Sequence, residues 1–450
     1  MFYKKDEFFL PRMVALAAPI LLQNLLSSSL NFIDVFMIGR LGDTAVAAAG
    51  GANQFFFIFL MLVFGIASGS AIFTAQYWGR KDIVNIRSIM GIGVTLTMGI
   101  SILFTAVTAI FPDKVMALFS GDPEVIILGA GYIRIIAWSF IVMAMSISYA
   151  VVLRSTENVI YPMMASMTGI LLNTGLNYLL IFGNLGFPKM GVLGAAWATL
   201  FSRIVEMLII ISITYTKKLP AAAGLSDLFR FNFQQVKAYL SKSVPVVLQS
   251  VGWAGGYSVY SMIYGHISTE SLAAFSIAGS VERICLIFYT GVGSACSIMV
   301  GNRIGAGEEK RARDYAGNFL FIGVIVSFVI SILLFVLRHP IVGIYNLSEV
   351  SQEYMLGILL VMSAIMWAKA CNIIFHMGVF KAGGDTFFSM CVDVGGVWLV
   401  GIPIALITGF YFGFPVHIIV AFLTIEEIVK MSVGFKRFLS GRWLNNLVDE

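Results

Sequence analysis

The sequence predicts an all-α polytopic membrane protein, with twelve transmembrane helices in two pseudo-symmetric six-helix bundles. Three observations lead to this fold class. The 450-residue chain is 59% hydrophobic and 12% charged, which leaves too few polar residues to cover a water-exposed globule. Its apolar stretches are long enough to cross a bilayer. Its two halves also repeat each other in register, as set out below.

The apolar segments are separated by turns that mostly carry Gly, Pro or charge. They begin near Met13, Ala45, Ser88, Val125, Tyr161, Val192, Val244, Leu272, Tyr315, Tyr354, Phe388 and Pro415. If the N-terminus is cytoplasmic, only four of the 29 Lys and Arg fall in external loops: Arg40, Lys114, Lys189 and Arg338. Because basic loops stay inside, we expect a multi-pass protein of the cell (plasma or inner) membrane with both termini cytoplasmic.

The two halves align without a gap when the sequence is shifted by 226 positions. The matched pairs include Pro19 with Pro245, Gln23 with Gln249, Gly39 with Gly265, Gly65 with Gly291, and Arg87 with Arg313. We therefore expect an N-terminal lobe over 1–216, a cytoplasmic interlobe linker with an interfacial LSDLFRFNF portion over 217–242, and a C-terminal lobe over 243–450. Six helices per half place both halves in the same orientation, with a substrate path between them near the midplane.

The first apolar segment carries Asp34 near its outer end and Pro19 fifteen residues earlier. A carboxylate at membrane depth is costly and is a functional candidate by default. Proline weakens the helical hydrogen-bond ladder. A charge and a hinge on one helix indicate a switch. The alternative is that Asp34 only caps the helix or pairs permanently with a neighbour.

Polar residues on the fifth and sixth segments could surround Asp34. Asn173 and Asn177 are four residues apart and share a helix face, while Thr199 lies in the small-residue stretch GAAWATL. Carboxylate, amide and hydroxyl oxygens suit a proton or Na⁺. Ordinary interhelical hydrogen bonding is an equally good explanation.

The second half carries Glu282, Lys369 and Asp393 at helix depth. The simplest account is an interhelical charge set in which Lys369 neutralises one acid and the other acid binds a cationic substrate or a second ion. A wholly structural ion-pair network remains open. Arg203 and Glu206 are three apart on one segment and are expected to pair locally. Glu426 and Glu427 receive no role.

Several motifs together resemble the multidrug and toxic compound extrusion (MATE) family over nearly the whole chain. They are MIGRLG after Asp34, NTGLNYLLIFG from Asn173, GAAWAT from Gly194, VGNRIGAGEEKRAR, KAGGDT, and Asp393 with GIPIA. The resemblance implies two six-helix lobes, V-shaped about a central cavity, that export amphipathic, often cationic compounds in exchange for H⁺ or Na⁺. The sequence looks more like the DinF branch, because the acids typical of the NorM branch would fall near Trp253 and Ala370.

The resemblance also assigns roles. It makes Asp34 the cation-coupling carboxylate, with Asn173, Asn177 and Thr199 beside it and Pro19 as the bend. Some relatives have Asp where this chain has Asn177, and the lost carboxylate favours H⁺ over Na⁺. No certain metal site is expected, although Na⁺ could bind at these four polar residues.

The predicted function is a cation-coupled antiporter that works by alternating access. The GxxxxGK[ST] nucleotide loop is absent from the sequence, so we expect no enzyme activity, no cofactor and an ion gradient as the energy source. The expected partners are small amphipathic or cationic organic substrates and membrane lipid, with no nucleic acid, for a monomer. The alternatives are a lipid-linked precursor flippase and, from another class, a sensor or scaffold.

Overall fold

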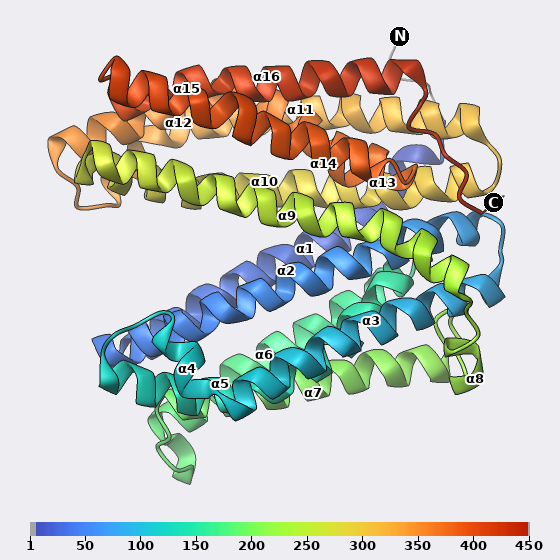
Figure 1. Ribbon diagram of the computed structural model, residues 1–450, viewed down its shortest axis with the longest axis horizontal. Coiled ribbons are helices and arrows are strands. Elements are labelled where there is room, and N and C mark those ends of the chain that lie inside the picture. The colour runs from blue at the N-terminus through green and yellow to red at the C-terminus, as the bar shows by residue number, and fades with distance from the viewer. Residues whose placement is uncertain (1–5, 449–450) are drawn as a thin grey trace. The chain divides into compact units, whose positions relative to one another are not determined.

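The computed structural model describes residues 6–448, apart from the side chains of residues 30–32. The described residues form helices joined by short turns, with no strand among them, which confirms the all-α prediction (Figure 1). The first half contains α1 (Phe9–Gly39), α2 (Asp43–Gly79), α3 (Ile83–Ile110), α4 (Pro112–Ala117), α5 (Pro123–Ser155), α6 (Ile160–Phe182), the 3₁₀ turn η1 (Asn184–Gly186), α7 (Val192–Thr216) and α8 (Leu225–Leu228).

The second half begins with α9 (Phe233–Ile267), α10 (Thr269–Gly305) and α11 (Glu309–Gly343). The next spanning stretch consists of α12 (Glu349–Ile373), the π-helical segment η2 (Ile374–Val379) and α13 (Phe380–Ala382). It is followed by α14 (Thr386–Gly395), the π-helical segments η3 (Gly396–Gly401) and η4 (Ile407–Tyr411) on either side of α15 (Ile402–Leu406), and α16 (Val416–Ser440).

Ten helical stretches of the described chain have both the length and the apolar composition to cross a membrane. The two further long helices, α9 and α16, have 35 and 25 residues. Their polar residues, described below, dilute the hydropathy of helices that are otherwise long enough to span. With these two, the helices number the twelve that the sequence predicts.

Helix ends follow local sequence rules. Asp82 and Asp122 accept hydrogen bonds from the backbone N–H groups of Asn85 (3.1 Å) and Glu124 (2.9 Å), and so cap α3 and α5. Ser268 caps α10 through the N–H of Ser271 at 3.0 Å. Gly183 ends α6 with a φ of 74°, a left-handed conformation that favours glycine.

The chain forms two compact units whose boundaries lie inside helices. The N-terminal unit is Leu22–Val247, and the C-terminal unit combines Met1–Leu21 with Leu248–Glu450. These bounds differ from the predicted lobes, because the first part of α1 and the first part of α9 each pack with the other half of the sequence. The boundaries at residues 21 and 247 are themselves 226 positions apart, two residues after Pro19 and Pro245.

The contacts of these helix segments lie within their own units. Phe9 on α1 packs edge-on against Tyr315 and Phe319 of α11, with ring centroids 5.0 Å apart in both pairs. On α9, the Tyr239 hydroxyl donates to the carbonyl of Ile66 at 2.7 Å. Helix–helix packing of this kind, rather than sequence proximity, decides which unit each segment joins.

The linker after α7 is anchored to the N-terminal unit by α3. Arg87 forms an ion pair with Asp227 at 3.2 Å, and the Ser88 hydroxyl donates to the carbonyl of Arg230 at 3.0 Å. Two linker aromatic rings, Phe229 and Phe233, are exposed. This exposure suits the predicted position at the membrane interface, which stays a prediction.

A glycine on α3 lets the linker approach. A Cβ on Gly91 would lie 1.8 Å from the carbonyl oxygen of Leu228, so we expect Gly91→Ala to displace the linker and cost about 1–3 kcal/mol of stability, as overpacking does. Gly99→Ala on the same helix is the matched control, because its Cβ would meet nothing within 4 Å. Thermal unfolding of both variants in detergent checks this; equal melting temperatures would contradict it.

Candidate functional site

The N-terminal unit brings together all four residues predicted for a cation site. The carboxylate Oδ1 of Asp34 on α1 accepts a hydrogen bond from Asn177 Nδ2 on α6 at 2.6 Å. The same nitrogen lies 3.1 Å from Asn173 Oδ1, one turn away on α6. Asn173 Nδ2 in turn lies 3.2 Å from the hydroxyl oxygen of Thr199 on α7. The polar groups of three helices therefore form one connected set.

When the oxygen and nitrogen of the Asn173 amide are exchanged, Asn173 no longer accepts from Asn177 Nδ2 but gains a hydrogen bond to the carboxylate of Asp34. Its nitrogen then donates to Asp34 Oδ1 at 3.0 Å, and its oxygen accepts from the hydroxyl and the N–H of Thr199 at 3.2 and 3.3 Å. Asn173 and Asn177 are both buried. The buried Oδ1 of Asn177 has no hydrogen-bond partner among the described residues. An orphaned acceptor next to a carboxylate fits a site that receives a proton or a small cation.

Charged neighbours of this site come from α5 and α7. Arg203 and Glu206 pair at 2.7 Å, which confirms the predicted local pair. Arg154 donates to Gln23 Oε1 on α1 at 2.7 Å, a contact that no spacing in the sequence predicts. In the sequence, only the repetition of Gln23 as Gln249 marked this glutamine as a residue of interest.

Pro19 lies within the continuous helix α1. Proline has no N–H to donate, so the carbonyl four residues earlier, that of Ala15, loses its usual helical partner. The unit boundary falls two residues further on, after Leu21. The geometry thus places the predicted hinge beside the point where α1 passes from one unit to the other.

The C-terminal unit contains the predicted charge set and enlarges it. Lys369 on α12 forms an ion pair with Glu282 on α10, as expected. Asp393 on α14 is also paired with a lysine, an arrangement that matches the ion-pair network left open by the sequence; its predicted role toward a substrate or a second ion stays a prediction. Lys430 on α16 lies 3.1 Å from Asp393 Oδ1 and 2.5 Å from Glu426 Oε1.

Further polar groups extend this set beyond the predicted residues. Gln249 Nε2 donates to Asp393 Oδ2 at 3.0 Å, and the Tyr260 hydroxyl donates to Glu426 Oε2 at 2.6 Å. Asn372 Nδ2 donates to Glu427 Oε2 at 2.7 Å. The four-residue spacing of Glu426 and Lys430 was visible in the sequence, but their contact with Asp393 depends on how α14 packs on α16.

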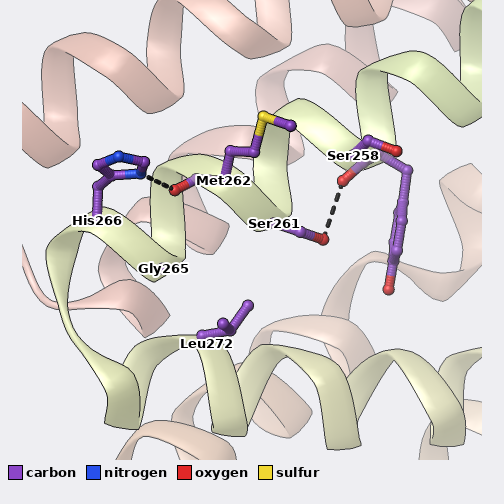
Figure 2. Close-up of a pocket in the computed structure, with 7 residues that line it drawn as sticks. Ser258, Ser261, Met262, Gly265, His266 and Leu272 are labelled. Atoms are coloured by element: carbon purple, nitrogen blue, oxygen red, sulfur yellow. Dashed lines mark hydrogen bonds between the residues drawn. The ribbon is translucent and has the colours of Figure 1, made fainter. Parts of the chain in front are cut away.

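A separate hollow of about 640 Å³ lies between α9 and α10, within the C-terminal unit (Figure 2). Its lining includes an aromatic ring, a thioether, hydroxyls and an imidazole, from Tyr257, Ser258, Ser261, Met262, Gly265, His266 and Leu272. The His266 ring and the Ser261 hydroxyl are held by carbonyl groups of α9 at 2.8 and 3.1 Å. It is a wide, shallow hollow rather than an enclosed ligand pocket.

The described residues contain no group of three or more His, Cys, Asp or Glu that could hold a metal ion.

The repeated, all-helical membrane fold, with carboxylates buried in each unit, is typical of membrane transporters. The MatE family model matches residues 19–179 and 245–407, two segments that begin at the repeated prolines. The chain belongs to the MatE family, which confirms the resemblance seen in its motifs.

Relatives and solved structures agree with this assignment. The chain is 25% identical over 396 residues to the probable multidrug resistance protein YoeA of Bacillus subtilis (strain 168), covering 87% of this chain and 85% of that one. It is 24% identical over 413 residues to a probable multidrug resistance protein NorM of Bradyrhizobium diazoefficiens, covering 91% and 88%. Its assignment to the DinF branch stays a prediction.

The fold is shared with solved transporter structures. An outward-facing multidrug resistance MATE family transporter of the MOP superfamily superposes with a TM-score of 0.86 at 18% identity, covering 96% of this chain and 94% of that one. A crystal structure of MATE in the bent conformation gives the same score and identity and covers 96% of each chain. At this identity the likeness concerns the fold.

Proposed function

We propose that this protein is a cation-coupled antiporter that exports amphipathic, often cationic compounds across the cell membrane. The observation that carries the proposal is the connected set of Asp34, Asn177, Asn173 and Thr199 inside an apolar bundle. The family match supports transport rather than enzyme catalysis, and relatives named as multidrug resistance proteins support the substrate class.

We propose H⁺ rather than Na⁺ as the coupling ion. Among the four site residues, Asp34 supplies the only carboxylate, and its Oδ1 already faces the amide nitrogen of Asn177. A sodium ion needs several oxygen ligands turned toward it. A proton needs one carboxylate oxygen, and the amide and hydroxyl groups can then stabilise the neutral acid.

Transport would proceed by alternating access. A cation entering from outside neutralises Asp34, α1 bends at Pro19, and the substrate is released outward. The free carbonyl that Pro19 leaves in α1 makes bending less costly. Glu282, Asp393 and Lys369 are proposed to serve the substrate or a second ion; because Glu282 and Asp393 each face a lysine, an incoming cation must displace that lysine.

The proposed setting is the plasma or inner membrane, in contact with lipid, as a monomer with both termini cytoplasmic. The scarcity of Lys and Arg in the external loops supports this orientation. No cofactor is proposed, and the energy would come from the ion gradient alone.

The test is efflux of a fluorescent organic cation from proteoliposomes under an imposed pH gradient or an imposed Na⁺ gradient. We expect the pH gradient to drive efflux and the Na⁺ gradient to leave it near the rate of protein-free vesicles. Efflux driven by the Na⁺ gradient alone would overturn the choice of H⁺ as the coupling ion. Drive by neither gradient would overturn antiport and favour a lipid-linked precursor flippase, which assays with a fluorescent lipid would then examine.

A further inference from the structure

A second polar centre lies in the C-terminal unit around Glu426 on α16. Oxygen Oε2 of Glu426 accepts from the Tyr260 hydroxyl at 2.6 Å, and Oε1 lies 2.5 Å from Lys430 Nζ. The ammonium group also reaches Asp393 Oδ1 at 3.1 Å. The side chains of Glu426 and Lys430 are only 7% and 4% exposed. One lysine is therefore shared between the buried carboxylate of Glu426 and the partly buried carboxylate of Asp393.

This centre occupies the repeat-equivalent place of the Asp34 site. The 226-residue shift maps Asp34 on Tyr260, and it maps Thr199 on Ile425, the residue before Glu426. In the first half the acid comes from the first long helix and the hydroxyl from the sixth. In the second half the hydroxyl comes from the first long helix and the acid from the sixth. Tyr260 is thus the exact repeat equivalent of Asp34, whereas Glu426 is the equivalent of Leu200, the residue after Thr199 on α7.

The charges around Glu426 do not balance. Four carboxylates come from α10, α14 and α16, against two lysines from α12 and α16: Glu282, Asp393, Glu426 and Glu427, with Lys369 and Lys430. The exposed Arg283 beside Glu282 offsets at most one acid, and His376 on η2 is bonded to Ser389 at 2.8 Å. Excess negative charge at membrane depth is costly, so the set favours uptake of a positive charge.

The N-terminal unit has no such excess. Near Asp34, the acids are Asp34 and Glu206, and the arginines are Arg203 and Arg154. Arginine stays protonated in proteins, so this group is neutral when both acids are ionised. By charge alone, the demand for a proton is greater in the C-terminal unit than at Asp34.

The surrounding backbone leaves room for the centre. The π-helical segment η3 begins and ends with glycines, Gly396 and Gly401, and both glycines lie against the polar centre around Glu426. A Cβ on Gly396 would lie 2.3 Å from Lys430 Cε, and a Cβ on Gly401 would lie 1.8 Å from the Tyr260 hydroxyl and 2.2 Å from Glu426 Oε2. Single π-turns of this kind recur at functional sites.

Two buried polar atoms at the centre have no hydrogen-bond partner among the described residues. They are the Tyr264 hydroxyl, one turn after Tyr260 on α9, and Oδ1 of Asn372, whose nitrogen holds Glu427. Buried polar atoms are rarely left unpaired. Both atoms are placed to accept or donate a hydrogen bond when a group at this centre changes its protonation.

We infer that Glu426 is a second proton-binding site, which loads in the same transport cycle as Asp34. The inference rests on the proposed antiport. A proton added to Glu426 gives a neutral acid that keeps its contact with Tyr260, while Lys430 remains paired with Asp393. A metal cation does not fit here, because the Lys430 ammonium already occupies Oε1 and would repel it.

Voltage dependence tests this second proton. Exchange of one proton for one monovalent organic cation is electroneutral, whereas two protons move one net charge per cycle. A potential of 100 mV then changes the attainable substrate ratio by roughly 50-fold. We expect this dependence in wild type and in Glu353→Gln, which removes an exposed carboxylate of α12 outside the charge set. We expect its loss in Glu426→Gln, which should keep electroneutral export driven by the pH gradient.

Two outcomes in vesicles would overturn the inference and leave the proposed function intact. One is pH-driven export in wild type without voltage dependence, and the other is full voltage dependence in Glu426→Gln. If no gradient drives export at all, the protonation of Glu426 is tested directly, by infrared difference spectra of the detergent-solubilised protein between acidic and neutral pH. A carboxylic acid band that Glu426→Gln removes and Asp34→Asn retains supports the second site, and its absence overturns it.

Discussion

Asp34→Asn is expected to abolish gradient-driven export while the protein folds and inserts normally. Asparagine keeps the size and the hydrogen-bonding capacity of the side chain but cannot be protonated or carry charge. If Na⁺ were the ion, two unit charges 4 Å apart interact by about 4 kcal/mol at an effective dielectric constant of 20, so binding would weaken roughly 1,000-fold. Efflux from proteoliposomes under both gradients, with wild type in parallel, measures the loss.

Asp43→Asn is the matched control for this experiment. Asp43 is exposed in the first turn of α2, and its change should leave efflux within the error of wild type. Substrate binding in detergent separates coupling from recognition, and we expect Asp34→Asn to retain it. Export by Asp34→Asn at the wild-type rate would show that the carboxylate is only structural.

Lys430→Met is expected to cause the largest loss of stability among the substitutions considered. The variant leaves the buried Glu426 and the partly buried Asp393 without their shared ammonium group. Breaking a buried ion pair from one side costs about 3–5 kcal/mol, because the partner charge remains without compensation. Methionine preserves most of the apolar volume of lysine, so the charge is the main change. The melting temperature of the detergent-solubilised protein reports the effect.

Two further variants isolate the cause. Lys436→Met lies on the same helix at an exposed position and should melt close to wild type. The double variant Lys430→Met with Glu426→Gln removes one of the two stranded charges and should recover part of the loss. A double variant no more stable than Lys430→Met would attribute the effect to packing rather than to charge.

The parts of the fold that depend on local sequence could be predicted. Long apolar segments define the helices because each one satisfies its own backbone hydrogen bonds in lipid. The repeat of Pro19 at Pro245 gave the internal symmetry. The spacing of Asn173 and Asn177 gave a shared face, since residues four apart lie one above the other on a helix.

The parts that depend on packing between helices could not be predicted. Periodicity alone does not say that Asp34 meets Asn177, 143 residues away; the family resemblance supplied that expectation. The contact between Lys430 and Asp393 also joins two helices whose separation no spacing rule gives. The π-helical segments η2 and η3 could not be predicted either, because a π-turn alters the helical hydrogen-bond pattern over only a few residues and leaves no periodic pattern in the sequence.

The unit boundaries inside α1 and α9 also bear on the order in which this protein matures during synthesis. The N-terminal unit includes residues up to Val247, among them Tyr239, which is bonded to Ile66. It is therefore incomplete when its sixth long helix, α7, has been made. Phe9 on α1 waits longer, since its partners on α11, Tyr315 and Phe319, emerge some 300 residues later. Neither half of the sequence therefore contains all the packing partners of its own helices, and the first part of α1 is made long before the α11 residues that it contacts.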